Sequence, residues 1–321
     1  MTELIEVRHL KVRHVPKKAA AKELVKGIDL SITKGRIVGI IGESGSGKSM
    51  AMKALMGLLP EGVQAESQSY LFDGQAVKDA ADLPISMIFQ DPMTSLDPVR
   101  TVGYHLREVI FRQQKLSKAA CDQLAIQQLE KVGIPQPEQR LKQYPHELSG
   151  GMRQRVMIAM ALSCNPELLI ADEPTTALDV TIQAQILELM KDLKKQMNTS
   201  IMMITHDLGV IAEMADYVLV MYAGMVMEYC DVRLLFKNPL HPYTKGLINA
   251  LPSISDAKEM LYVIEGSVPS LYDMPAGCRF WPRCPYAEER CKNEVPKLTD
   301  CGDRKVRCFL HGQGKQGGKY G

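Results

Sequence analysis

The sequence lacks three features that would each point to a particular class of protein. It has no strong charge imbalance, since 39 Lys and Arg residues oppose 37 Asp and Glu residues, and this argues against a general nucleic-acid binder. Its longest uncharged, mostly apolar run, Tyr217–Met227, is too short to span a bilayer. The first residues, Met1–Glu6, are acidic and lack the apolar core of a secretory signal. We therefore expect a cytosolic protein, with any membrane role exerted through a partner.

The remaining composition is that of an ordinary globular protein. Hydrophobic residues make up 45% and charged residues 24% of the 321 positions, which is enough for one large domain with an appendage, or for two domains. No internal repeat or low-complexity segment is evident. The eight cysteines are unevenly placed. Because a cytosolic setting disfavours disulfides, a late cluster of cysteines favours a metal site. The five clustered cysteines are Cys278, Cys284, Cys291, Cys301 and Cys308.

The stretch Gly42–Ser49 predicts a phosphate-binding loop, because two glycines five residues apart precede Lys and Ser. The glycines allow a tight turn that brings backbone N–H groups toward a phosphate. Lys48 supplies a positive charge for the β- and γ-phosphates, and the Ser49 hydroxyl can bind Mg²⁺. The β-branched run Arg36–Ile41 predicts a strand before the loop and Ser49–Met56 a helix after it, an order that points a helix N-terminus at the anion.

A second informative stretch is the apolar run Leu168–Ala171, which is followed by Asp172 and Glu173. A strand of this kind delivers both carboxylates to its C-terminal end, where ligands bind in open α/β sheets. Asp172 is predicted to hold Mg²⁺, and Glu173 to act as the general base toward the attacking water. Without the phosphate loop, an Asp-Glu pair after a strand is more often a solvated turn.

A third stretch, Leu148–Arg155, contains Leu-Ser-Gly-Gly, in which Ser149 can cap a helix and the glycines leave backbone N–H groups open to a second phosphate. The three stretches occur in the order phosphate loop, Leu-Ser-Gly-Gly, and strand ending in Asp-Glu. In this order they resemble the ATP-binding subunit of an ABC transporter. The resemblance runs continuously from about residue 4 to residue 310.

The resemblance implies roles for further residues. Gln90 matches the glutamine that reaches Mg²⁺ and the water, and His206 matches the switch histidine that senses the γ-phosphate. Leu148–Gly151 match the signature that contacts ATP on the opposite subunit, and Asp179 matches a loop that crosses the dimer interface. The implied catalytic residues are Glu173, His206, Gln90 and Lys48. The implied ATP-binding residues are Gly42, Ser44, Gly45, Ser46, Gly47, Lys48, Ser49, Met50, His14, Gln90, Asp172 and His206, and the implied Mg²⁺ ligands are Ser49, Gln90 and Asp172.

One position departs from the family pattern. The family stacks adenine on an aromatic residue just after the first strand, whereas Lys11–His14 contain no Phe, Tyr or Trp. His14 or Arg13 can stack instead, and we take His14 as the candidate.

Strands that alternate with helices predict an α/β sheet with helices on both faces. With the resemblance, the expected fold is a P-loop NTPase (RecA-like) sheet core with an antiparallel β subdomain, a helical insertion and a small cysteine-rich C-terminal extension. We expect a nucleotide-binding domain over residues 1–235, with the helical subdomain at about 91–160. The C-terminal extension is expected over 236–321, with its cysteine cluster at 278–308.

The extension narrows the subgroup. The motif Asn238–Thr244 and the stretch Gln90–Pro98 resemble ATP-binding subunits of oligopeptide, dipeptide and nickel importers, and many of the peptide-import members carry a cysteine-rich tail. Four thiolates can bind Zn²⁺ or a [4Fe–4S] cluster, and the spacing separates the two poorly. The resemblance favours the cluster, with a structural role, and leaves Cys301 over. The implied metal ligands are Cys278, Cys284, Cys291 and Cys308.

The sequence thus predicts an ATPase subunit that powers di- or oligopeptide import from the cytoplasmic face of the membrane. Implied partners are a second ATP-binding subunit (a paralogue or a second copy), two transmembrane permease subunits and an external solute-binding protein, with no nucleic acid. One alternative is a nickel or metallophore importer. A second is a soluble ATPase of this superfamily, which would carry a coiled-coil insertion or tandem cassettes not seen in the sequence, or a redox sensor.

Overall fold

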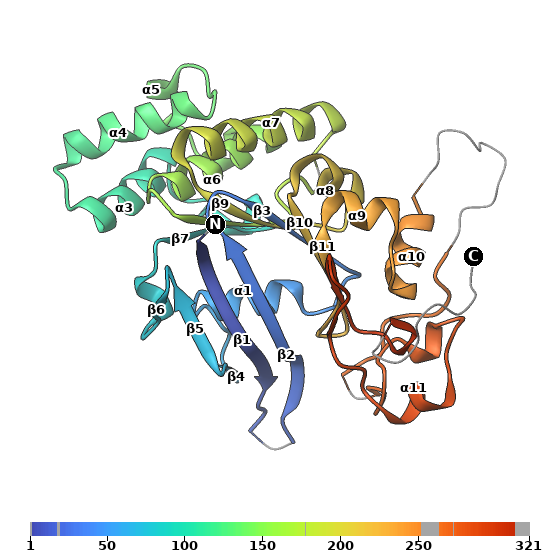
Figure 1. Ribbon diagram of the computed structural model, residues 1–321. Helices are drawn as coiled ribbons and strands as arrows, with labels where there is room; N and C mark the ends of the chain where they lie inside the picture. Colours follow the sequence, from blue (N-terminus) through green and yellow to red (C-terminus); the bar gives the residue numbers. More distant parts are fainter. Residues whose placement is uncertain (1, 18–19, 177, 252–262, 272, 312–321) are drawn as a thin grey trace. The chain divides into compact units, whose positions relative to one another are not determined.

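The computed structural model describes residues 2–17, 20–176, 178–251, 263–271 and 273–311 (Figure 1). Parts of the predicted C-terminal extension, residues 252–262, 272 and 312–321, lie outside these ranges. The chain divides into two compact units. Unit 1 combines the segments 1–81 and 205–321, and unit 2 is the segment 82–204.

An antiparallel sheet in unit 1 is dominated by two long strands, β1 (Glu3–His14) and β2 (Lys22–Thr33), which lie side by side in Figure 1. The strand order is β2-β1-β5-β6, with β4 also paired to β1. Alternate side chains of β1, such as Ile5 and Val7, are fully buried, as expected for a strand with one face on a core. The shorter strands are β4 (Val63–Glu66), β5 (Ser69–Phe72) and β6 (Gln75–Ala76).

A second set of strands in unit 1 surrounds the buried strand β3 (Ile37–Ile41). β10 (Tyr217–Tyr222) pairs with β3 in parallel, and β11 (Met225–Asp231) pairs with β10 in antiparallel fashion. β10 and β11 thus form a hairpin that turns at Ala223 and Gly224. Two further strands, β13 (Arg304–Val306) and β12 (Thr299–Asp300), extend the order to β12-β13-β11-β10-β3.

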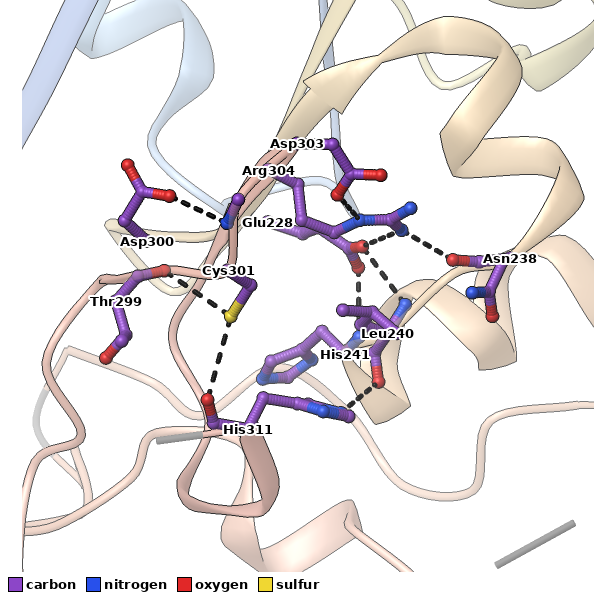
Figure 2. A network of polar contacts seen from close by, with 11 residues as sticks. Glu228, Asn238, Leu240, His241, Thr299, Asp300, Cys301, Asp303, Arg304 and His311 are labelled. Carbon is purple, nitrogen blue, oxygen red and sulfur yellow. Dashed lines mark hydrogen bonds and ion pairs between the residues drawn. The ribbon is translucent and has the colours of Figure 1, made fainter. Parts of the chain in front are cut away.

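The pairing of β13 with β11 attaches the end of the predicted extension to the nucleotide-binding part. A buried ion pair holds it there: the Arg304 guanidinium lies 3.4 Å from the carboxylate of Glu228, and both side chains are almost fully buried. Glu228 also accepts hydrogen bonds from the backbone N–H groups of Leu240 and His241. Figure 2 shows Arg304 between this carboxylate, Asp303 and the carbonyl of Asn238. The extension therefore shares a sheet with β11, and the predicted boundary near residue 236 remains a prediction.

The helices of unit 1 include α1, which follows β3, and short helices of residues 205–321, here called the C-terminal segment. α10 begins at Pro242, a favourable first position, and its N-cap His241 accepts a hydrogen bond from the backbone N–H of Tyr243. Among the described residues, no helix is both long and apolar enough to cross a membrane. The bounds are α1 (Lys48–Leu55), α8 (Leu208–Met214), α9 (Val232–Lys237), α10 (Pro242–Asn249) and α11 (Glu289–Asn293). Single turns of 3₁₀ helix occur at Ala80–Asp82, Trp281–Arg283 and Phe309–His311.

Unit 2 contains three parallel strands, in the order β9-β8-β7. All five residues of β8 and of β9 are buried, which explains their continuous apolar sequence. The predicted helical region is confirmed as a run of helices between β7 and β8. The bounds are β7 (Ile85–Ile88), β8 (Leu168–Asp172), β9 (Ser200–Ile204), α2 (Pro92–Ser95), α3 (Val102–Gln114), α4 (Lys118–Lys131), α5 (Pro137–Arg140), a 3₁₀ turn Pro145–Glu147, α6 (Gly150–Leu162) and α7 (Val180–Met197).

Candidate nucleotide-binding site

The phosphate loop of unit 1 connects the C-terminal end of β3 to the N-terminus of α1, as the sequence predicts. Gly42 has a φ of 151°, and a Cβ at this position would collide with the carbonyl oxygen of Met221, so only glycine fits. Gly47, in the left-handed region, is the N-cap of α1 and provides no side-chain cap. The loop therefore ends at a helix N-terminus, a position that favours an anion.

Lys48 lies inside the loop. Its side chain is buried, and its ammonium group donates to the carbonyl oxygens of Gly42 (2.6 Å) and Glu43 (3.0 Å). The Ser46 hydroxyl lies 3.4 Å from the same ammonium group. The loop thus closes around a positive charge, which suits a polyphosphate ligand.

The other loop residues differ in exposure. Ser44 and Gly45 are exposed, Ser46 is fully buried, and Ser49 and Met50 are half-buried on the first turn of α1. His14, the candidate for adenine stacking, is half-buried at the end of β1 and pairs with Lys22 of β2 and Val63 of β4. His206, also in unit 1, is exposed and directly precedes Asp207, the N-cap of α8.

In unit 2, the ends of two adjacent strands bring Gln90 and Glu173 together. Gln90 follows β7 and Glu173 follows β8, and the Gln90 amide donates to the Glu173 carboxylate at 3.0 Å. The Thr176 hydroxyl donates to the same carboxylate oxygen at 2.8 Å, a contact that the sequence analysis missed. Asp172, the last residue of β8, is buried. The carboxylate of Glu173 is therefore held in one orientation by two donors.

The backbone of Glu173 has a φ of 48°, which is uncommon for a residue with a side chain. Its N–H donates to the carbonyl oxygen of Ile204 at 2.8 Å. The turn after β8 is therefore fixed by a neighbouring strand, and strained backbone of this kind clusters at functional sites. Nothing in the residue type of Glu173 indicates this conformation.

The predicted signature residues also gather in unit 2. Ser149 caps α6 by accepting from the N–H of Met152 at 3.3 Å, and Leu148 is buried. Asp179 caps α7 by accepting from the N–H of Ile182 at 2.9 Å. A Cβ on Gly151 would lie 2.7 Å from the Ile182 side chain, so glycine is needed for the N-termini of the two helices to approach. The structure thus brings Leu148–Gly151 and the start of α7 together.

The four cysteines implied as metal ligands, Cys278, Cys284, Cys291 and Cys308, line one cavity of about 20 Å³, whose walls include Phe280, Trp281 and Phe309. Burial raises the pKa of the Cys278 thiol, that of Cys284 to about 11 and that of Cys308 to about 12, with the neighbouring cysteines adding to each increase. Cys301 instead donates to the carbonyl oxygens of Thr299 and His311 (Figure 2).

The cysteines are not arranged around a single point. Within the described part of the chain, no group of three or more His, Cys, Asp or Glu side chains is placed so that it could hold a metal ion.

Two family descriptions match the chain. The family described as "ABC transporter" matches residues 25–176, which include the phosphate loop, Leu148–Gly151 and Glu173. The family described as "Oligopeptide/dipeptide transporter, C-terminal region" matches residues 227–291, from β11 to three of the four cavity cysteines.

Solved structures support the fold. The chain is similar to cbiO1 of Clostridium perfringens, part of the ABC transporter complex cbiONQ. The TM-score is 0.61 at 27% identity, over 74% of this chain and 92% of that one. It is also similar to the ATP-binding cassette MJ0796 bound to ADP and Pi, with a TM-score of 0.61 at 26% identity, over 71% of this chain and 99% of that one.

Relatives of known role are similar over nearly their whole length. The chain is 50% identical to the oligopeptide transport ATP-binding protein AppD of Bacillus subtilis, over 97% of this chain and 98% of that protein. It is 48% identical to the dipeptide transport ATP-binding protein DppD of Escherichia coli, over 95% and 96% respectively. It is 50% identical to the oligopeptide transport ATP-binding protein OppD of Salmonella typhimurium, over 89% and 87%. The chain therefore belongs to the ATP-binding proteins of the ABC transporter family, in the group of oligopeptide and dipeptide transporters.

Proposed function

We propose that this chain binds and hydrolyses ATP to power a multi-subunit importer of di- or oligopeptides. The observation that carries the proposal is the carboxylate of Glu173, oriented by Gln90 and Thr176 at the end of β8. A fixed hydrogen-bond acceptor at the end of a buried strand suits a general base. The chain has a complete phosphate loop and belongs to the peptide-transport group, and we therefore take peptides as the class of transported substrate.

In this proposal the phosphate loop, Gly42–Ser49, cradles the phosphates of ATP with backbone N–H groups, and Lys48 balances their charge. Ser49, Gln90 and Asp172 would hold Mg²⁺, which would supply positive charge to balance that of the phosphates. Glu173 accepts a proton from the attacking water, and His206 contacts the γ-phosphate. Met50 and His14 complete the ATP-binding set, with His14 against the adenine.

The signature residues act on a different nucleotide. Leu148–Gly151 and Asp179 contact ATP bound to a second ATP-binding subunit, so that two subunits enclose two ATP molecules. The N-terminus of α6 supports this role for Leu148–Gly151, because helix N-termini favour anions. The second subunit is a paralogue or another copy of this chain.

The partners follow from the group to which the chain belongs. Two permease subunits form the path through the membrane, an external protein captures the peptide, and closure of the ATP-binding pair drives the permeases. The chain then lies on the cytoplasmic face of the membrane, held there by the permeases.

ATP-dependent uptake by the assembled importer tests this function. Vesicles containing the importer take up labelled di- or oligopeptide with the wild-type chain, and we expect no uptake with Lys48→Ala. Uptake of nickel and not peptide would favour the metallophore alternative. Unchanged peptide uptake with Lys48→Ala would contradict the function. The three relatives compared are all named for peptide transport, which favours peptide over nickel.

We further propose that Cys278, Cys284, Cys291 and Cys308 bind a [4Fe–4S] cluster with a structural role. The support is a set of four thiols on one cavity, the ligand set of such clusters. A zinc ion needs all four sulfurs about 2.3 Å from one centre, whereas a cluster binds each sulfur to a different iron and so tolerates more widely spaced thiols. The present cavity is roughly the size of one water molecule, so its walls must open to admit the cluster.

Iron, sulfide and zinc analysis of anaerobically purified protein tests the cluster. We expect about four irons per chain and a broad absorption band near 400 nm, both lost in Cys284→Ser. One zinc per chain and no visible absorption would show that the four cysteines bind zinc and not the cluster. If neither iron nor zinc is found, these four residues are ordinary thiols and the proposed metal site is wrong.

A further inference from the structure

The second residue of the phosphate loop, Glu43, is acidic, although the loop is predicted to bind an anion. Its carboxylate is paired with Arg283 of the C-terminal segment, whose terminal nitrogen Nη1 lies 2.9 Å from Oε1 and 3.1 Å from Oε2. The Arg283 side chain is 6% exposed and that of Glu43 30%. The ion pair joins residues 240 positions apart in the sequence.

The position of Arg283 is set by groups outside the loop. Its Nε donates to the carbonyl oxygen of Glu265 at 2.8 Å, and its Nη2 to that of Ile264 at 3.1 Å. The guanidinium also lies 5.7 Å from the ring centre of Tyr222. Because a guanidinium is a planar fork, two carbonyl contacts leave Nη1 directed at Glu43.

The backbone of Glu43 is also held from the C-terminal side. Its N–H donates to the hydroxyl of Tyr243 at 2.9 Å, and Tyr243 is fully buried. The ring of Tyr243 packs against Tyr222 and Phe280, with ring centres 4.7 and 5.3 Å away. Glu43 is thus fixed by its side chain and by its N–H, both through residues beyond position 205.

We propose that Arg283 is a positioning residue for nucleotide binding, which neutralises the carboxylate of Glu43 within the phosphate loop. The proposal rests on the ATP-binding function proposed above. Without Arg283, an uncompensated carboxylate lies within the loop that receives a polyphosphate. Coulomb repulsion over several ångströms at the edge of a protein weakens binding on the order of tenfold.

The test is the affinity of the full-length chain for a non-hydrolysable ATP analogue with Mg²⁺, measured by calorimetry at low and high salt. We expect Arg283→Ala and Arg283→Gln to weaken binding about tenfold. The double variant Arg283→Ala/Glu43→Gln should recover to within about twofold, because the repelling charge is gone. The deficit of the single variant should shrink at high salt.

The matched control is Arg112→Ala, which removes an arginine from an exposed Glu108–Arg112 pair of α3 at 2.7 Å. Its affinity should equal that of the wild type. Wild-type affinity in both Arg283 variants would overturn the proposal. Weak binding that Glu43→Gln does not rescue would overturn the charge argument and reduce Arg283 to a structural contact. If the wild type and Arg112→Ala both fail to bind ATP, the proposed ATPase function itself is overturned.

Discussion

Two arginines of the C-terminal segment, Arg283 and Arg304, each form an ion pair with a glutamate of the nucleotide-binding part, but the surroundings differ. Glu228, the partner of Arg304, is fully buried and accepts two backbone hydrogen bonds as well. Glu43, the partner of Arg283, is 30% exposed and belongs to the phosphate loop. Breaking the buried pair of Glu228 lowers the stability of the fold, because a charge is left buried. Breaking the pair of Glu43 lowers the affinity for an anionic ligand, because a negative charge is left in the phosphate loop. One pair should therefore control stability and the other nucleotide affinity.

The largest effect on stability is expected for Arg304→Ala. This change leaves the carboxylate of Glu228 buried without a counter-charge, so the free energy of unfolding should fall by about 3–5 kcal/mol. Denaturant unfolding measures it. The double variant Arg304→Met/Glu228→Gln should recover part of the loss, because it removes the buried charge and keeps one oxygen acceptor for the backbone N–H groups. A decrease below about 1 kcal/mol in Arg304→Ala would remove the contrast between the two pairs.

The next effect is a dependence of stability on pH, from His241 beside the Glu228 pair. Burial, aided by the charge of His311, lowers the pKa of His241 from 6.5 to about 3. The unfolded chain therefore binds a proton below pH 6.5 that the folded chain rejects, and stability should fall by about 1.4 kcal/mol per pH unit down to the folded pKa. Asn can also cap a helix, so His241→Asn should flatten this slope. If the free energy of unfolding of His241→Asn falls equally steeply below pH 6.5, His241 is excluded as the cause.

A smaller effect on stability is expected for Arg283→Ala. Because Glu43 is 30% exposed and its carboxylate stays in contact with water, the free energy of unfolding should fall by less than in Arg304→Ala, even though nucleotide affinity falls tenfold. Unfolding curves of the variants used for the binding measurements provide the values. A loss as large as that of Arg304→Ala would show that both pairs serve the fold.

The smallest effect is expected for Arg112→Ala on α3. Its pair with Glu108 is exposed and four residues apart on one helix, a kind of pair that contributes about 0.3–0.5 kcal/mol. Thermal unfolding should therefore match the wild type closely. A larger change would mean that exposed pairs in this chain are not a neutral reference, and that the values for Arg283 need a different control.

The sequence predicted the parts of the site that are continuous in the chain. The phosphate loop, the strand that ends in Asp172 and the capped helix after Ser149 each carry their chemistry within about eight residues. The alternating strands and helices, with the family resemblance, predicted the α/β fold.

The contacts between distant segments could not be predicted in this way. The pairing of β13 with β11 depends on three residues, Arg304–Val306, two of which are charged, so no apolar alternation marks them as a strand. The Arg283–Glu43 pair spans 240 positions, and the left-handed conformation of Glu173 comes from its hydrogen bond to Ile204. Each of these features is determined by packing and not by local sequence pattern.

The most direct test of the account is ATP hydrolysis by Glu173→Gln, with ATP binding measured in parallel. Glutamine keeps the size of the side chain but cannot accept a proton from water. We expect wild-type affinity for ATP with Mg²⁺, accumulation of an ATP-bound dimer and loss of turnover. Hydrolysis at the wild-type rate would contradict the assignment of Glu173 as the general base and, with it, the mechanism built on the end of β8.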